Sequence, residues 1–337
     1  LDLSALSPRL PATRLAGRAT LQTRGLDRPA ALQATLDNAL PGAWDTGRLP
    51  LRQLQLQASG RPDQTDRLTL DRFELQLGDG AGPAGRISGQ GSWQGDVLAL
   101  RLQADGLLPA RLHRSAAPIT LGGPLALQLR GLDSLRGMAA ATTLPGGAPR
   151  PPAPAAAGLL LALDGTLSGR WLADAGQPVQ LRLVAEADAR HLLVTQAEAQ
   201  AGTARASLHG RADADGSGWR ISADARLADF DPRPWWLGPE GSAWRRGPHR
   251  LQAEASARLL WRPAATPRTA DLAIDRLLAA LDGEARLRLG DSLLAGVPVS
   301  GEATLRSDGP TAAVQAALAL AGNHLTLQGQ GGGAPAA

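Results

Sequence analysis

The sequence predicts a mainly β fold: an elongated, curved and repetitive sheet of mostly antiparallel strands, one apolar face and few short helices. Three observations lead to this prediction. Many short runs alternate apolar and polar residues, turn residues stand between the runs, and the apolar residues are small or aliphatic. Of 337 residues, 43% are hydrophobic but only 3% are aromatic. Any buried layer must therefore consist of Leu, Ala and Val, which suit a thin layer better than a thick globular core.

The alternating runs recur along the chain. Successive side chains of a strand point to opposite faces, so each run predicts one apolar and one polar face. The runs cover residues 51–57, 68–70, 73–77, 97–104, 179–184, 219–227, 285–289 and 324–328. Turn chemistry occurs at 78–80, 88–91, 94–96 and 215–218. Residues 30–38 and 271–281 could instead form helices because they are rich in Ala and Leu, and 274–281 is equally compatible with a strand.

A degenerate repeat organises the chain. Residues 85–109, 202–232 and, more weakly, 296–321 each read as a Gly-led strand, a turn and a second strand. We expect these units to be β-meanders that add strands to one long sheet. The stretch 137–158 is rich in Pro, Ala and Gly and cannot pair in a sheet. The predicted organisation is a first β-sheet block at 1–136, a loop or linker at 137–158, a second block at 159–328 and a disordered tail at 329–337.

Composition and spacing argue against catalysis. The absence of cysteine excludes disulfides, thiolate metal sites and cysteine nucleophiles. The net charge of +4 comes from scattered arginines without a basic stripe, so nucleic-acid binding is not expected. Asp213 and Asp215, followed by Gly216, resemble the start of a calcium loop, but the expected Glu is missing and a turn is the better interpretation. We expect no enzyme activity, no cofactor and no metal site.

The apolar faces carry the predicted function. If no second layer covers them, they form a large apolar surface, which usually marks a binding site. Each methylene withdrawn from water there gains about 0.8 kcal/mol, so a groove of Leu and Ala can bind acyl chains without specific contacts. The alternative is that these faces pack against a second sheet in a closed sandwich. The predicted groove-lining residues are Leu68, Leu70, Leu75, Leu77, Leu100, Leu102, Leu181, Leu183, Ile221, Leu227, Leu287, Leu289, Leu325 and Leu327.

A stretch rich in Trp and Arg, residues 230–249, is the most unusual part of the sequence. One interpretation is an interfacial flap in which arginines contact lipid headgroups while indoles lie at an apolar boundary. The other is a loop whose indoles cover the end of the sheet's apolar layer. The residues in question are Trp235, Trp236, Trp244, Arg245 and Arg246.

Three motifs resemble the segments that follow strands in TamB-like proteins of the AsmA superfamily. They are Asn-Ala-Leu-Pro-Gly-Ala-Trp-Asp-Thr-Gly-Arg-Leu-Pro-Leu at 38–51, Leu-Pro-Ala-Arg-Leu at 108–112 and Phe-Asp-Pro-Arg-Pro-Trp-Trp at 230–236. The resemblance covers most of the chain through loose, compositional motifs. It implies a periplasmic protein of Gram-negative bacteria whose taco-like or open solenoid sheet is lined with apolar side chains. It supplies no catalytic residues.

The resemblance also implies partners and a role. TamB-like proteins are anchored in the inner membrane by an N-terminal helix, engage a BamA-type outer-membrane barrel through a C-terminal domain, and are linked to phospholipid movement and to assembly of outer-membrane proteins such as autotransporters. The sequence has neither the anchor helix nor an evident C-terminal domain, so we expect an internal fragment that binds phospholipid acyl chains. The alternative function is a β-solenoid adhesin or autotransporter passenger with a purely structural or interaction role.

Overall fold

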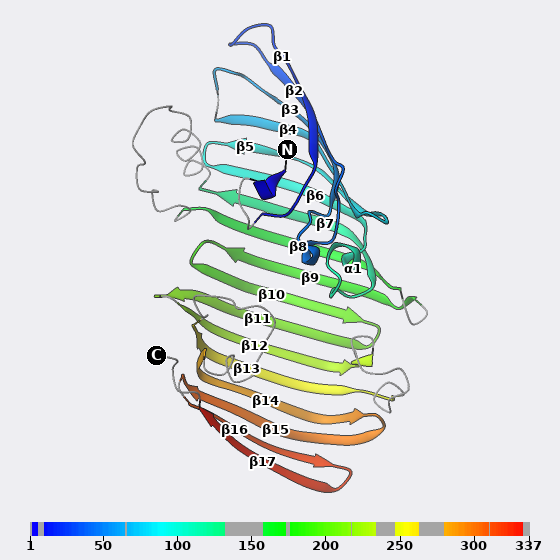
Figure 1. Ribbon diagram of the computed structural model, residues 1–337, viewed down its shortest axis with the longest axis vertical. Coiled ribbons are helices and arrows are strands. Elements are labelled where there is room, and N and C mark those ends of the chain that lie inside the picture. Colours follow the sequence, from blue (N-terminus) through cyan, green and yellow to red (C-terminus); the bar gives the residue numbers. More distant parts are fainter. Residues whose placement is uncertain are drawn as a thin grey trace. The chain divides into compact units, whose positions relative to one another are not determined.

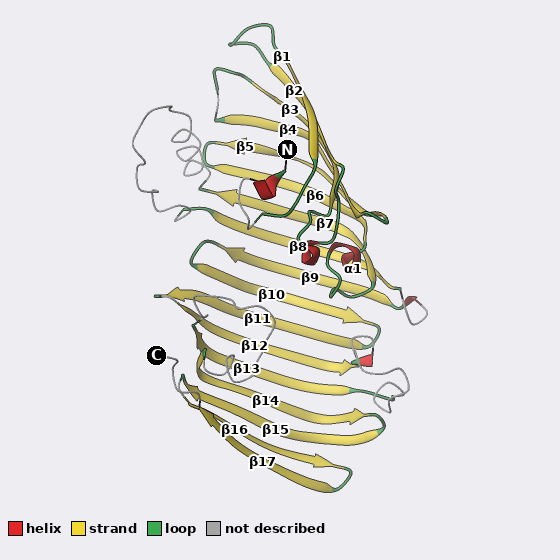
Figure 2. Cartoon of the chain, in the orientation of Figure 1, coloured by secondary structure: helices red, strands yellow, loops and turns green. Residues whose placement is uncertain are grey.

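We describe the protein from a computed structural model. The structure describes residues 2–5, 10–64, 66–131, 158–172, 176–216, 218–233, 247–262, 280–309 and 311–332. Strands account for 73% of it and helices for 5% (Figure 2), which confirms the prediction of a mainly β fold with few short helices. The chain divides into two compact units, 1–189 and 190–337.

The first unit is an up-and-down antiparallel sheet in which each described strand pairs with the next along the chain (Figure 1). Within this unit, β1 pairs only with β2 and β9 only with β8 among the described residues, so the sheet does not close on itself. The strands are β1 (Leu15–Gln22), β2 (Ala30–Asn38), β3 (Leu51–Gly60), β4 (Arg67–Asp79), β5 (Gly82–Gln94), β6 (Val97–Leu107), β7 (Ile119–Arg130), β8 (Leu160–Trp171) and β9 (Pro178–Ala187), and the helical turns are η1 (Leu3–Ala5), η2 (Trp44–Thr46) and α1 (Pro109–Leu112).

The second unit repeats this arrangement, and its described strands pair in chain order with antiparallel register. Its described strands are β10 (His191–Ala201), β11 (Ala204–Asp215), β12 (Gly218–Phe230), β13 (Leu251–Trp261), β14 (Leu281–Leu294), β15 (Val297–Asp308), β16 (Thr311–Leu320) and β17 (Asn323–Gly332). Every alternating run named above lies within a strand of one of the two units.

Two local predictions are wrong. Residues 30–38 form strand β2, because Leu32 and Leu36 lie opposite Ala58 and Leu54 of β3 and this cross-strand pairing overrides the helix propensity of alanine. Residues 88–91 lie inside β5 and form no turn. A Cβ at Gly89 would lie 2.1 Å from the carbonyl oxygen of Arg101, so glycine here permits close strand approach.

The sequence repeat corresponds to β-hairpins. Its three copies fall on β5–β6, β11–β12 and β15–β16, each joined by a two-residue turn. In the first two copies the second strand is irregular near its end, and the residue there has a positive φ, 58° at Gly106 and 50° at Asp229. Glycine and aspartate tolerate this conformation better than most residues.

The predicted block boundaries lie partly outside the described chain. The division of the chain into the two units falls between residues 189 and 190. Residues 137–157 of the predicted linker, and 271–279 of the second possible helix, are outside the described residues. Strand β17 ends at Gly332, four residues beyond 328.

Candidate hydrophobic binding face

In the first unit one face of the sheet is apolar from strand to strand. Cross-strand partners place Leu100 beside Leu127, and Leu127 beside Leu163. A neighbouring row joins Leu102 to Leu125 in the same way. The opposite face carries the polar residues of the same strands, so the alternation read from the sequence becomes a two-sided sheet.

The second unit has the same two-sided construction. One row of successive cross-strand partners on its apolar face is Leu208, Ala225, Ala255, Leu287, Ala303, Ala316 and Leu327. A second row contains Ala223, Ala257, Ala285, Leu305 and Val314. From β12 to β16, seven of the ten positions in these two rows are therefore alanine.

All fourteen predicted groove residues lie on these apolar faces, those up to Leu183 in the first unit and those from Ile221 in the second. Of the fourteen, Leu70 alone is buried, with 9% of its surface exposed. Leu287, Leu325 and Leu327 are exposed by 40%, 54% and 57%. Together with Leu183 of the first unit, which is 37% exposed, they mark positions on each face that no second layer of described chain covers.

The alanines of the second unit form the floor of a shallow groove of about 490 Å³. Alanine side chains leave room above the sheet, and the longer Leu287, Leu305 and Val314 also line the groove. The rows run from strand to strand, so the groove crosses the strands and does not follow one of them. Its lining includes Ala223, Ala225, Ala255, Ala257, Ala285 and Ala303, none of which is among the fourteen groove residues predicted from the sequence.

One end of the first unit's apolar face is covered by chain that we call the cap, residues 10–14, 39–50 and 108–118. At this strand end Ala104, Leu107, Leu121 and Val179 are buried. Polar-face residues at the same end stay exposed, such as Gln103 next to Ala104. The covering chain therefore lies on the apolar side, where α1 packs against β4, β5 and β7.

Polar contacts hold the cap in place. The buried Asn38 carboxamide accepts hydrogen bonds from the backbone N–H groups of Arg14 (3.0 Å) and Leu40 (3.1 Å), and donates one to the carbonyl oxygen of Leu51 (3.0 Å). Arg111 of α1 forms an ion pair with Asp79 at the end of β4.

Two arginine side chains of the cap shift the acidity of the carboxyl groups that they contact. The hydrogen bond from Arg111 holds the pKa of Asp79 below its usual value. Arg114 donates through Nε to Asp45 at 2.7 Å and lowers the pKa of that carboxyl likewise.

Two of the three motifs that resembled TamB-like segments, 38–51 and 108–112, supply most of the cap.

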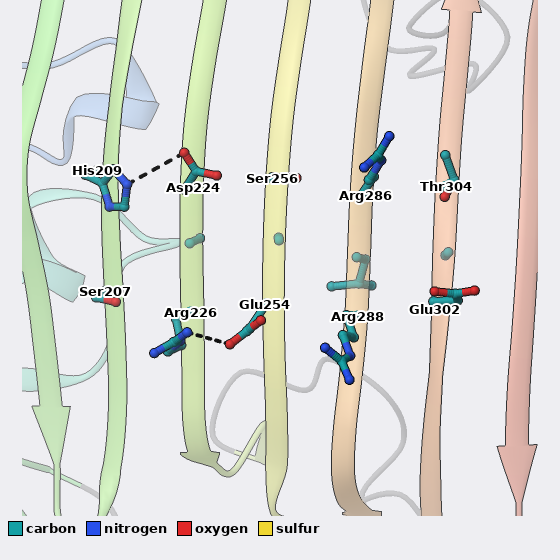
Figure 3. A pocket seen from close by; sticks show the side chains of 14 residues that line it. Ser207, His209, Asp224, Arg226, Glu254, Ser256, Arg286, Arg288, Glu302 and Thr304 are labelled. Atoms are coloured by element: carbon teal, nitrogen blue, oxygen red, sulfur yellow. Dashed lines mark hydrogen bonds and ion pairs between the residues drawn. The ribbon is translucent and has the colours of Figure 1, made fainter.

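The opposite face of the second unit bears charged side chains arranged in rows across the strands (Figure 3). One row alternates in sign through Arg226, Glu254, Arg288 and Glu302, with Arg226 donating to Glu254 at 2.6 Å. Opposite charges in neighbouring strands favour this register, because a slip of one residue would move them onto the apolar side.

A Ser, a His and an Asp also lie on this polar face. The His209 imidazole is 3.6 Å from Asp224, and no described hydrogen bond joins it to Ser207. Both partners of the pair are largely exposed to solvent. The hollow they share with the charged rows has a volume of about 570 Å³ and opens onto the surface.

The two aspartates that resembled a calcium loop make protein contacts. Asp213 pairs with Arg211 at 2.6 Å, which lowers its pKa, and Asp215 pairs with Arg220 at 2.5 Å across the β11–β12 hairpin. Within the described ranges no three His, Asp or Glu side chains are grouped to hold a metal ion.

Comparison with known proteins gives no relative. No protein-family model, no curated protein and no solved structure matches the chain.

In the part of the chain that the structure describes, no helix has the length and apolar character to cross a bilayer. The predicted flap residues Trp235, Trp236, Trp244, Arg245 and Arg246 lie outside the described residues.

Proposed function

We propose that this chain is a periplasmic segment of a TamB-like protein whose apolar sheet faces bind lipid acyl chains. In this role it supports the movement of phospholipid between the inner and outer membranes and the assembly of outer-membrane proteins. The observation that carries the proposal is the uncovered apolar face, which continues over successive strands in each unit. A soluble protein rarely exposes such a surface unless something binds to it.

The surface suits a long hydrocarbon better than a compact ligand. Most of its side chains are aliphatic, form no hydrogen bonds and repeat from strand to strand, so a hydrocarbon chain gains similar free energy at each position along a row. At about 0.8 kcal/mol per buried methylene, even partial burial of an acyl chain stabilises the complex by several kcal/mol. The uniform lining also permits a bound chain to slide across the strands.

The adhesin alternative is less well supported. Solenoid passengers wind successive coils around a closed interior, and their stacked repeats bury a continuous core. Here every described pairing between named strands is antiparallel between chain neighbours, and the leucines of one face remain open to solvent. This arrangement leaves the apolar face available to an external ligand.

The test is lipid capture by the purified protein, measured by mass spectrometry of the extracted lipid. We expect phospholipid to co-purify, and a photoreactive residue at position 102 to crosslink to acyl chains. Leu102→Arg should reduce the bound lipid several-fold, because it introduces a charge into the apolar row beside Leu125.

The matched control is Arg101→Glu, one residue away on the polar face, where Arg101 lies opposite Gln90 and Ala126. It should leave lipid capture nearly unchanged. A lipid-free protein without crosslinks at position 102, or equal losses in the two variants, would contradict the proposal.

A further inference from the structure

The polar face of the second unit carries its charges in an ordered pattern. One row across the strands passes through Arg226, Glu254, Arg288 and Glu302 (Figure 3). Its charge is positive on β12, negative on β13, positive on β14 and negative on β15. Because the row holds an even number of alternating charges, it has the opposite sign at every position when it is read from the other end.

A row with this property can pair with a second copy of itself. Consider a two-fold axis in the plane of the interface, parallel to the strands and midway between β13 and β14. It lays one copy face down on the other and places β12 opposite β15 and β13 opposite β14. Each row remains opposite itself. Arg226 then faces the partner's Glu302, and Glu254 faces the partner's Arg288.

The neighbouring rows fit the same axis. Residues two apart in a strand share a face, so these rows also lie on the polar side. One row places Arg258 opposite the partner's Glu284, and another places Arg220 opposite the partner's Asp308. Each of the four contacts occurs twice by symmetry, which gives eight pairs of opposite charge. In the four rows through 220, 222, 224 and 226, the other facing pairs from β12 to β15 each join a charged residue to an uncharged one: Arg306 to Ser222, Arg286 to Ser256, Asp224 to Thr304 and Asp282 to Leu260.

Other axes parallel to the strands fit less well. An axis along β13 would bring Glu254 onto its own copy, and an axis along β14 would do the same to Arg288. Axes displaced by one strand to either side would bring Asp282 opposite the partner's Asp213 or Asp308. Like charges across an interface are unfavourable, so the pattern selects one arrangement.

We propose that the polar face of the second unit is a self-association surface through which two copies of this chain form a two-fold dimer. The side chains of Arg226 and Glu254 are 67% and 54% exposed and can reach a facing surface. Arg288 and Glu302 form no ion pair within the described residues, and the dimer gives each a charged partner.

The size of the face suits a dimer. The six strands from β11 to β16, about 4.8 Å apart and each about eight residues long at 3.4 Å per residue, offer roughly 800 Å². A standard interface buries about this area on each partner. The surface goes beyond lipid binding, because its partner is a second copy of the chain and it lies on the side of the sheet opposite the alanine groove.

The experiment is sedimentation velocity of the full chain over a range of concentrations at low ionic strength. We expect a monomer–dimer equilibrium that shifts toward the monomer as salt is added, because salt screens exposed charges. Arg226→Glu replaces two attractive contacts of the dimer with two repulsive ones, so it should weaken association by about ten-fold or more. Glu302→Arg should have the same effect.

A mixture of these two variants tests the geometry directly. In a mixed dimer the new carboxylate at position 226 faces the new guanidinium at position 302, and the original Arg226 and Glu302 face each other at the symmetry-related contact. The mixture should therefore associate about as strongly as the parent. Damage within a single copy would not be repaired by mixing.

The matched control is Arg211→Glu. Arg211 is 63% exposed on the same face and pairs with Asp213 at 2.6 Å, as Arg226 does with Glu254, but in the dimer it faces the partner's Ala313. It should leave association unchanged.

Arg226→Glu should in turn leave lipid capture unchanged, so this proposal and the lipid proposal can fail separately. The dimer is overturned if the parent stays monomeric at low ionic strength or if Arg226→Glu associates as strongly as the parent. Equal weakening by Arg211→Glu and Arg226→Glu, or a mixture of Arg226→Glu and Glu302→Arg that stays monomeric, would overturn it as well.

Discussion

The covered strand end of the first unit and the alanine groove of the second have the same sequence pattern but differ in exposure. Leu121, beneath the cap, is 5% exposed, whereas Leu287, beside the groove, is 40% exposed. Both leucines lie on the apolar face of antiparallel strands, Leu121 between Thr120 and Gly122 and Leu287 between Arg286 and Arg288. Alternation determines which face of the sheet a side chain occupies. Whether that face is exposed to water depends on whether another segment of the same chain covers it.

A long connection between two strands accounts for the covered strand end of the first unit. Strands β5 and β6 are joined by residues 95 and 96 alone, which cannot reach back over the sheet. The connection from β6 to β7 spans 108–118 and carries α1 onto the apolar side. A long connection at one strand end thus converts part of the first unit's apolar face into a small core.

The largest expected effect on stability comes from truncating a buried leucine. Leu121→Ala should lower the free energy of unfolding of the first unit by roughly 2–4 kcal/mol, because it removes a fully packed side chain and leaves a cavity. Leu287→Ala, beside the open groove, should cost less than about 1 kcal/mol, since its side chain is already partly hydrated. Urea unfolding measures both, and similar costs would mean that the two regions do not differ in packing.

A smaller effect is expected from the polar side chain that joins the cap to the sheet. Asn38→Ala leaves the part-buried N–H of Arg14 and the buried C=O of Leu51 without their partner, at a cost of roughly 1–3 kcal/mol. Hydrogen exchange should become faster in the cap. Asn38→Asp keeps the acceptor but loses the donor. Its loss of stability and its rate of hydrogen exchange in the cap should lie between those of the parent and those of Asn38→Ala. Unchanged exchange in Asn38→Ala would show that the Asn38 hydrogen bonds do not hold the cap in place.

The sequence predicted the strands and their faces well because both follow from period-2 alternation, which is local. The runs containing Leu68, Leu102 and Leu287 all became strands with those side chains on one face. The two errors had non-local causes. Residues 30–38 are a strand because β3 pairs with them, and Gly89 permits the close approach of β6.

The candidate site was predicted only in part, for a related reason. Leucines were visible in the alternating runs, but the alanine floor of the groove becomes evident only when the strands are aligned side by side. The cap was likewise hidden, because residues 39–50 and 108–118 follow different strands and meet in space through the register of β3 to β7. No alternation connects them in the sequence.

The smallest expected effect comes from the Asp79–Arg111 ion pair, and it depends on pH. The folded state holds the pKa of Asp79 below 3.8 because Arg111 donates to the carboxylate. A lowered folded-state pKa contributes stability that is present above the unfolded value and is lost as pH falls below it toward the folded value. Asp79→Asn should therefore destabilise the cap by less than about 1 kcal/mol at neutral pH, and the variant should differ little from the parent at the acid end.

Hydrogen exchange of the Leu108 amide, which donates to Ala84 at 2.9 Å beneath α1, reports this loosening directly. The control is Asp63→Asn, because Arg61 lowers the pKa of Asp63 in the same way but at an exposed turn away from the cap. It should leave exchange at Leu108 unchanged. If both variants accelerate that amide equally, the ion pair acts through the stability of the whole sheet, and the cap is no separate element of the first unit.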